Sequence, residues 1–179
     1  MKSLAGLALL LSSSVNAVAA QPKLILACPQ IDGTQIRLLA EPASDGSRYY
    51  LEIGGRVDKA FTDMPDADFI GEIVLSKCIR HVLVFAIEYG PPYRKGVAVR
   101  KRLTGPGVDR IDFSEKALPL WLYVNSTELK VLIPNYGNEV ASRYLLYTFS
   151  AAQGQPGAPA AVDTEPVKRG FEAVRIDGH

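Results

Sequence analysis

The stretch that decides the fold class is CIRHVLVFAIEY, residues 78–89. As a strand, it has apolar side chains on both faces: Ile79, Leu83, Phe85, Ile87 and Tyr89 on one, and Val82, Val84 and Ala86 on the other. A run of this kind, rich in β-branched and aromatic residues, is typical of a central strand covered on both sides. Gly-Pro-Pro at 90–92 indicates a turn after it. The stretch therefore predicts a buried strand that begins at Cys78. It places His81 on the face of Ile79 and Leu83, as a structural residue rather than a catalyst.

Short alternating runs separated by turn residues continue on both sides of this strand. They lie at 23–27, 34–40, 48–53, 69–75, 94–103, 108–113, 120–124 and 128–133. Residues 140–149 fit a strand or a helix equally well. About nine short strands, roughly a dozen residues apart, predict an all-β fold, either an antiparallel β-sandwich or a small up-and-down barrel of hairpins.

The end of the chain has a different composition. Residues 151–170 are rich in Ala, Pro and Gly, which predicts a disordered C-terminal tail over 151–179, after an antiparallel β domain at 21–150. Phe171, Val174 and Ile176 lie in a short strand-like segment near the end of this tail. The interpretation we favour is that this segment is either a frayed end or a last strand that docks on the protein's own sheet. The alternative is that it adds to the sheet of a partner.

Residues 1–20 have the layout of a secretory signal peptide. Lys2 precedes a short apolar run, and small residues follow it up to Ala20. The apolar run is too short to span a bilayer, so we expect no transmembrane segment after cleavage. The sequence therefore predicts a periplasmic or secreted protein whose leader is of bacterial type.

Cys28 and Cys78 are the only cysteines of the chain. In an exported protein an even pair predicts a disulfide. The competing hypothesis is lipidation at Cys28, because Leu26-Ala27-Cys28 loosely resembles a lipoprotein cleavage site. Polar residues just before that triplet argue against lipidation, so a structural disulfide is the prediction.

Charge is divided along the chain. Residues 41–72 carry eight acidic and three basic side chains, whereas residues 90–110 carry six basic side chains and one acidic. Five of the basic side chains fall on one predicted strand: Arg94, Lys95, Arg100, Lys101 and Arg102. So many charges predict an edge strand, where they discourage aggregation. The functional alternative is a basic stripe that recognises an acidic protein surface, a glycan or a lipid headgroup.

No catalytic motif, metal signature or nucleotide loop stands out, so no catalytic residue, metal or cofactor is predicted. The chain is expected to be a binding module, as an adaptor, inhibitor or envelope-assembly factor, with a protein or glycan partner in the cell envelope. Nucleic acid is not expected, because the chain is exported and carries a formal charge of only +1. The alternatives are a hydrolase of envelope polysaccharide that uses Asp63 or Asp66, and a self-associating structural protein. The oligomeric state is left open.

Overall fold

The computed structural model describes residues 21–64, 66–103, 105–136 and 140–176. The predicted signal peptide at 1–20 lies outside the described residues. Within them the chain forms thirteen strands and three antiparallel sheets, with no helix and no closed barrel. The prediction of an all-β fold is confirmed, and the barrel alternative is wrong. None of the described residues forms a helix of the length and apolarity needed to cross a membrane.

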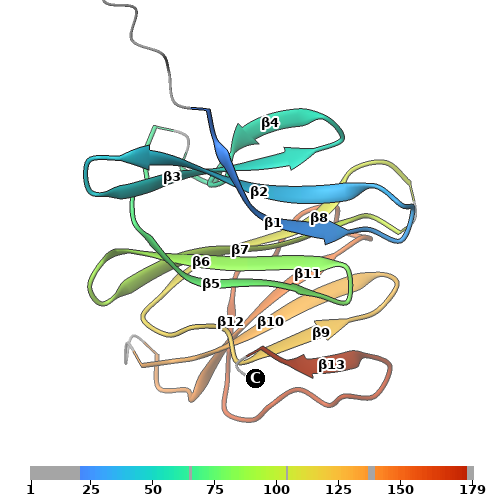
Figure 1. Cartoon of the computed structure of the whole chain (residues 1–179). Helices are drawn as coiled ribbons and strands as arrows, with labels where there is room; N and C mark the ends of the chain where they lie inside the picture. The colour runs from blue at the N-terminus through green and yellow to red at the C-terminus, as the bar shows by residue number, and fades with distance from the viewer. Residues whose placement is uncertain (1–20, 65, 104, 137–139, 177–179) are drawn as a thin grey trace, which may run out of the picture.

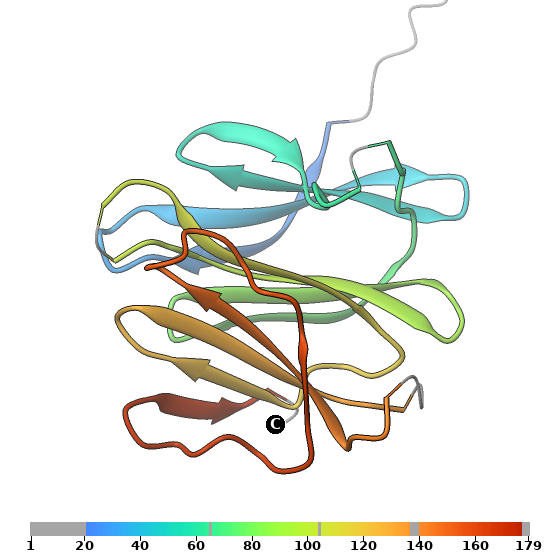
Figure 2. The ribbon, with the colours of Figure 1, turned by 180° about the vertical axis from the view of Figure 1, so that it is seen from behind.

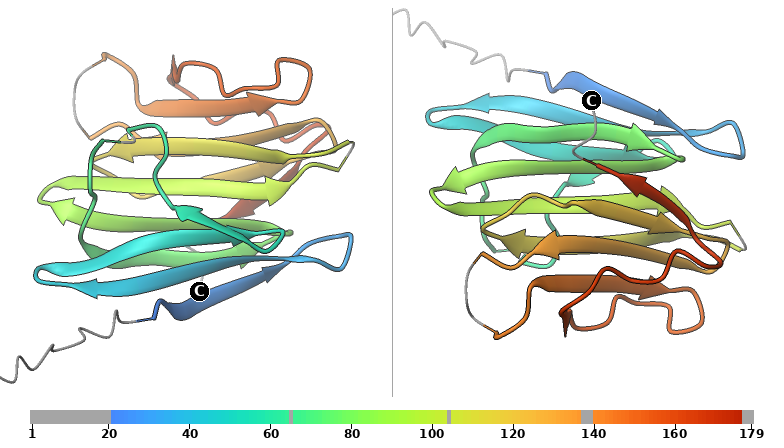
Figure 3. Two further views of the ribbon diagram at one scale, coloured as in Figure 1. Left: turned by 90° about the horizontal axis from the view of Figure 1, so that it is seen from above. Right: turned by 90° about the horizontal axis from the view of Figure 1, so that it is seen from below.

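The three sheets are stacked as layers (Figure 1). The N-terminal sheet has β1 (Lys23–Pro29), β2 (Gln35–Ala43), β3 (Gly46–Ile53) and β4 (Arg56–Lys59) in that order. The middle sheet has β5 (Glu72–Ile79), β6 (Val82–Gly90), β7 (Tyr93–Lys101) and β8 (Val108–Glu115) in that order. The C-terminal sheet has the order β12-β11-β10-β9-β13, built from β9 (Trp121–Val124), β10 (Glu128–Pro134), β11 (Tyr144–Ser150), β12 (Ala160–Val162) and β13 (Glu172–Arg175). Figure 3 shows the first four strands in front when the molecule is seen from above, and β9, β10 and β13 in front when it is seen from below.

Two apolar clusters lie between these layers, and β6 contributes to both. Leu83, Phe85 and Ile87 pack with residues of the N-terminal sheet, and Val82, Val84 and Ala86 pack with residues of the C-terminal sheet. All six side chains are fully buried. The prediction of a central strand covered on both faces is therefore confirmed, because a middle layer has no face left for water.

The start of this strand was predicted wrongly. Cys78 lies near the end of β5, and β6 begins only at Val82. Arg80 and His81 form the two-residue turn between them, with φ angles of 51° and 64°. His81 is therefore exposed in a turn and does not share a strand face with Leu83. Glycine and asparagine usually provide this left-handed geometry, and neither is present in this turn.

The position predicted for the basic strand is also wrong. β7 lies between β6 and β8 and pairs with both, so it is an interior strand. Its charges are compatible with that position because two of them are buried with partners. Lys95 forms an ion pair with Asp63 at 2.7 Å, and Arg100 forms one with Asp109 at 2.8 Å.

The disulfide between Cys28 and Cys78 is confirmed, and this bonding state leaves no thiol for lipidation at Cys28. It connects β1 of the N-terminal sheet to β5 of the middle sheet, with the two Cα atoms 5.3 Å apart. It thus joins two layers near the end of the molecule where the β1–β2 and β5–β6 turns lie.

The prediction of a disordered C-terminal tail is wrong. β12 pairs with β11, and β13 pairs with β9, so both are edge strands of the C-terminal sheet. The segment that joins them runs along the bottom of the molecule in Figure 2. Ile176 is buried in the core, and its N–H donates to the carbonyl oxygen of Leu120 at 2.9 Å. Composition alone missed this because existing sheet edges supply the hydrogen bonds and apolar contacts that the segment cannot supply to itself.

Candidate functional site

A pocket of about 380 Å³ opens at the end of the stack where the three sheets present their turns, on the right in Figure 1. Three sheets contribute to its lining. The N-terminal sheet provides the β1–β2 turn, the middle sheet provides the β5–β6 turn and the end of β7, and the C-terminal sheet provides the end of β9 and the start of β13. The lining residues are Gln30, Ile31, Asp32, Arg80, His81, Arg100, Lys101, Arg102, Leu103, Val124, Asn125 and Glu172.

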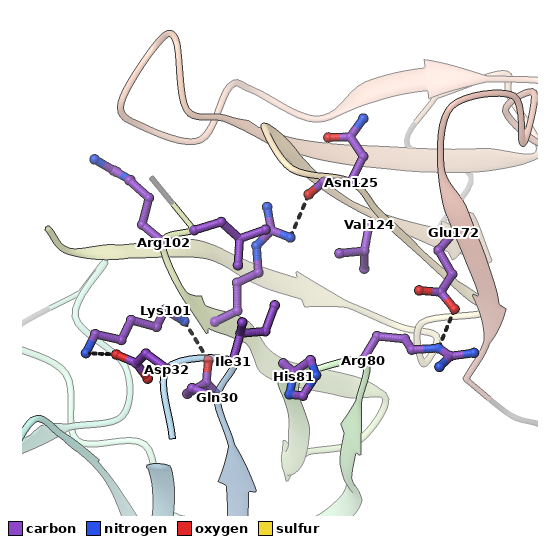
Figure 4. A pocket seen from close by; sticks show the side chains of 12 residues that line it. Gln30, Ile31, Asp32, Arg80, His81, Lys101, Arg102, Val124, Asn125 and Glu172 are labelled. Atoms are coloured by element: carbon purple, nitrogen blue, oxygen red, sulfur yellow. Dashed lines mark hydrogen bonds and ion pairs between the residues drawn. The ribbon is translucent and has the colours of Figure 1, made fainter. Parts of the chain in front are cut away.

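The lining is rich in cations. Four arginine and lysine side chains face two carboxylates, those of Asp32 and Glu172. Lys101 pairs with Asp32, and Arg80 pairs with Glu172 at 2.5 Å. Figure 4 shows these two pairs on opposite sides of Ile31 and His81. Both pairs are 40% or more exposed, so each is held weakly and can exchange its partner for another ion.

Arg100 and Arg102 share one carboxylate. Arg100 donates from Nε to Asp109 Oδ2 at 2.8 Å, and Arg102 donates from Nε to Asp109 Oδ1 at 3.2 Å. The Asp109 side chain is 1% exposed. One carboxylate cannot neutralise two guanidinium groups, so this cluster retains a positive charge. Arg102, 24% exposed, is the member that a solute can reach.

Arg100 also has a structural role. It donates to the carbonyl oxygens of Asn125 at 2.7 Å and Glu128 at 3.4 Å, so it connects the middle sheet to the β9–β10 turn. The neighbouring main chain is held as well, because Gln30 accepts a hydrogen bond from the N–H of Lys101 at 2.8 Å and donates one to the carbonyl oxygen of Cys28 at 3.0 Å. The main chain from which the Lys101 and Arg102 side chains extend is therefore held in place.

The electrostatics of the pocket favour the ionised form of Asp32. The ammonium of Lys101, followed by the hydroxyl and N–H groups of Thr34, lowers the pKa of Asp32 from 3.8 to about 2. Asp32 therefore stays charged at any pH above that value. His81 donates from Nδ1 to the carbonyl oxygen of Pro29 at 2.9 Å, because a carbonyl oxygen can only accept. This hydrogen bond orients the ring and leaves Nε2 as the atom that a ligand can address.

The predicted basic residues separate into two groups. Lys101 and Arg102 line the pocket, with Arg100 behind them. Arg94 and Lys95 lie further along β7 and are engaged elsewhere: Arg94 donates to the carbonyl oxygen of Lys116 and pairs with Glu88 at 3.7 Å, and Lys95 is 1% exposed. The five residues therefore do not form one continuous surface stripe.

The predicted C-terminal residues have partners within the protein. Phe171 contacts the Tyr123 ring edge-on at 6.3 Å, and Lys130 Nζ lies 4.3 Å from the centroid of the Phe171 ring. Val174 pairs with Leu122, and Ile176 is in the core. The segment docks on its own sheet, which is one of the two outcomes that we favoured from the sequence, and it is not frayed over Glu172–Arg175.

The acidic residues considered for catalysis lie away from this pocket. Asp63 pairs with Lys95 on the middle sheet, and Asp66 is exposed in the segment between β4 and β5. No group of three or more His, Cys, Asp or Glu residues within the described ranges is arranged to hold a metal ion. A second, more open pocket of about 340 Å³ lies near the opposite end of β6, and its lining includes Asp45, Glu72 and Glu88.

Sequence reasoning missed Arg80, His81, Asp32 and Glu172 as neighbours of Lys101 and Arg102. The available signal was the pair of polar residues that interrupts the apolar run at 80–81. Comparison of the chain with protein-family models, curated proteins and solved structures finds no match.

Proposed function

We propose that this protein is an exported binding module, acting in the periplasm or outside the cell, whose site is the pocket at the turn end of the three sheets. Its ligand carries a negative charge and belongs to a component of the cell envelope. The proposal keeps the binding class suggested by the sequence and moves the site from a strand surface to a pocket.

The observation that carries this proposal is the Arg80–His81 turn. Both residues have positive φ, and neither is Gly, Asn or Asp. Histidine adopts left-handed backbone more readily than most residues, but for Arg80 this backbone costs about 1–3 kcal/mol, and such residues cluster at functional sites. Both side chains line the pocket. A cationic side chain and an imidazole at a costly turn are best explained if the pocket needs them.

The charge of the pocket supports the same conclusion. The Arg100–Asp109–Arg102 cluster retains one positive charge, and the two flanking ion pairs are exposed. An anionic ligand would complete the cluster and compete for Lys101 or Arg80. Charge-assisted hydrogen bonds from Arg and Lys to an anion are stronger than neutral ones. No comparable observation favours hydrolysis by Asp63 or Asp66, so we do not propose it.

The test is affinity capture from an envelope extract, with four forms of the tagged mature protein. They are the wild type, the double variant Arg80→Asn/His81→Gly, the variant Arg102→Met, and the control Arg56→Met. Arg56 is a suitable control because it is 81% exposed on β4, away from the pocket. We expect both pocket variants to lose captured partner by roughly tenfold or more, the effect of one lost charge-assisted contact. We expect the control to match the wild type.

Capture that is equal for all four forms would overturn the proposal. The double variant guards against misfolding as an explanation, because asparagine and glycine suit this turn better than the native pair. If the captured species is a second copy of the same chain, the self-associating structural class replaces the binding class.

A further inference from the structure

We infer that the ligand of this pocket is an amphiphilic anion, a molecule with one acidic headgroup on an apolar body, such as an alkyl phosphate or an alkyl carboxylate. This inference rests on the proposed function and names the chemical class of its ligand. It follows from the way cationic and apolar side chains are combined in the pocket.

The cationic part of the pocket suits one compact headgroup. Arg102 supplies the accessible guanidinium of a cluster with one uncompensated charge, and Lys101, which precedes it in the chain, lines the same pocket. A planar guanidinium and an ammonium both bind phosphate and carboxylate oxygens well. The carboxylates of Asp32 and Glu172, at the two exposed ion pairs, disfavour a ligand with many charges spread over the whole pocket.

The apolar part is formed by Ile31 and Leu103, which occupy exposed positions where polar residues are more usual. Ile31 lies in the β1–β2 turn and is 65% exposed, and Leu103 follows β7 and is 40% exposed. Both line the pocket, together with the nearly buried Val124 of β9. Figure 4 shows Ile31 and His81 between the two flanking ion pairs. Two exposed apolar residues beside one pocket indicate a ligand with an apolar part to cover them.

The size of the pocket suits a small molecule. Its volume of about 380 Å³ lies near the lower end of the range of small-molecule sites, which is about 300–1,000 Å³. A bare inorganic anion would leave Ile31 and Leu103 in contact with water. A neutral alkyl compound would leave the Arg102 cluster with its excess charge. Only a ligand with an acidic headgroup and an apolar body both neutralises the Arg102 cluster and covers Ile31 and Leu103.

The experiment is isothermal titration calorimetry of the mature protein with five probes. Octyl phosphate and octanoate carry both parts, inorganic phosphate and acetate carry only the acidic part, and octyl glucoside carries only the alkyl chain. All alkyl probes are kept below their micelle concentrations. We expect the two alkyl anions to bind at least about tenfold more tightly than the other three, because each buried methylene adds to affinity. The tighter of the two alkyl anions then identifies the headgroup as phosphate or carboxylate.

Variants separate the two parts of the site. Ile31→Asn and Leu103→Asn should weaken octyl phosphate several-fold, and Arg102→Met should weaken it roughly tenfold or more, with Arg56→Met unchanged. Ile31 and Leu103 are exposed, so these substitutions are compatible with folding, which circular dichroism verifies. The inference would be overturned if the alkyl anions bound no more tightly than inorganic phosphate and acetate. It would also be overturned if Ile31→Asn and Leu103→Asn left the affinity for octyl phosphate unchanged.

Failure of this inference differs from failure of the proposed function. If no alkyl anion binds while the two pocket variants still lose the captured envelope partner, the pocket recognises an acidic group of a macromolecule and the amphiphile is wrong. If the capture is also insensitive to the pocket variants, both conclusions fall.

Discussion

Lys95 is a charged residue at the apolar interface of the N-terminal and middle sheets. Its side chain is 2% exposed, and its ammonium lies 2.7 Å from Asp63 Oδ2 and 4.5 Å from the centroid of the Phe69 ring. The centroid of the Phe61 ring lies 5.6 Å from the same ammonium. The Asp63 side chain is 38% exposed, so the two partners of this ion pair differ in their access to water.

This asymmetry leads to a prediction at the scale of single residues. Asp63→Ala removes the carboxylate that compensates the buried ammonium of Lys95, and we expect it to lower the free energy of unfolding by about 2–3 kcal/mol. Lys95→Met leaves a carboxylate that water can reach and keeps an apolar chain of similar length, so we expect a change within about 1 kcal/mol. Urea denaturation measures both. Equal losses for the two variants would contradict this account, and Lys59→Met on the exposed strand β4 serves as the control.

The two-residue turn between β5 and β6 sets where one strand ends and the next begins. Because it occupies Arg80 and His81, β6 starts at Val82 and Cys78 belongs to the strand before it. The sequence placed no turn here because its usual markers, Asn-Gly, Asp-Gly or Gly-Gly, are absent. β6, which follows the turn, is apolar and buried over most of its length, and its packing overrides the poor preference of Arg80 for left-handed backbone.

At the scale of this element we predict a gain in stability at the expense of binding. Arg80→Asn/His81→Gly relieves two left-handed residues. It loses the exposed hydrogen bond from His81 to Pro29 and the exposed ion pair of Arg80 with Glu172, which contribute little, so the free energy of unfolding should rise by about 1 kcal/mol. Thermal unfolding measures this change, and the capture experiment measures the loss of partner. A loss of stability in the double variant would show that the native turn is not strained, and would remove the observation on which the proposed function rests.

The disulfide acts at the scale of the whole molecule, because it joins β1 to β5 across two layers that, among the described residues, share no strand-pairing ladder and only the isolated backbone bridge between Ser47 and Gly71. It closes a loop between residues 50 apart in the sequence. The Cys28 carbonyl oxygen also accepts the hydrogen bond from Gln30, which in turn holds the backbone of Lys101. The bond therefore supports both the stack and one wall of the pocket.

Removing both cysteines with Cys28→Ala/Cys78→Ala should lower the free energy of unfolding by about 4 kcal/mol in the chain-entropy model. Denaturant titration of the variant, with the reduced wild type as a second comparison, checks this value. Binding of octyl phosphate should weaken in the same variant under conditions where it is still folded. A variant with unchanged stability would mean that the packing of Leu83, Phe85 and Ile87 alone holds these two layers together.

The sequence by itself determined the features that depend on local pattern. Alternating apolar residues and Gly, Pro and Asp turns were enough for an all-β chain of hairpins, since strand period and turn chemistry act over a few residues. The apolar run around Phe85 was enough for a strand covered on both faces, and two cysteines in a chain with a predicted signal peptide were enough to predict their pairing. Each of these conclusions rests on neighbours in the chain or on simple counting.

Only the tertiary structure decided which distant residues meet. The order of the strands made β7 an interior strand, buried Lys95 and Arg100, and placed β13 on β9. The same stacking brought Asp32, Arg80, Lys101 and Glu172 to one pocket from four parts of the chain. The physical reason is that sheet packing is driven by apolar area, which many strand orders can bury from the same local pattern, so the neighbours of a charged side chain follow from the one order that the chain adopts.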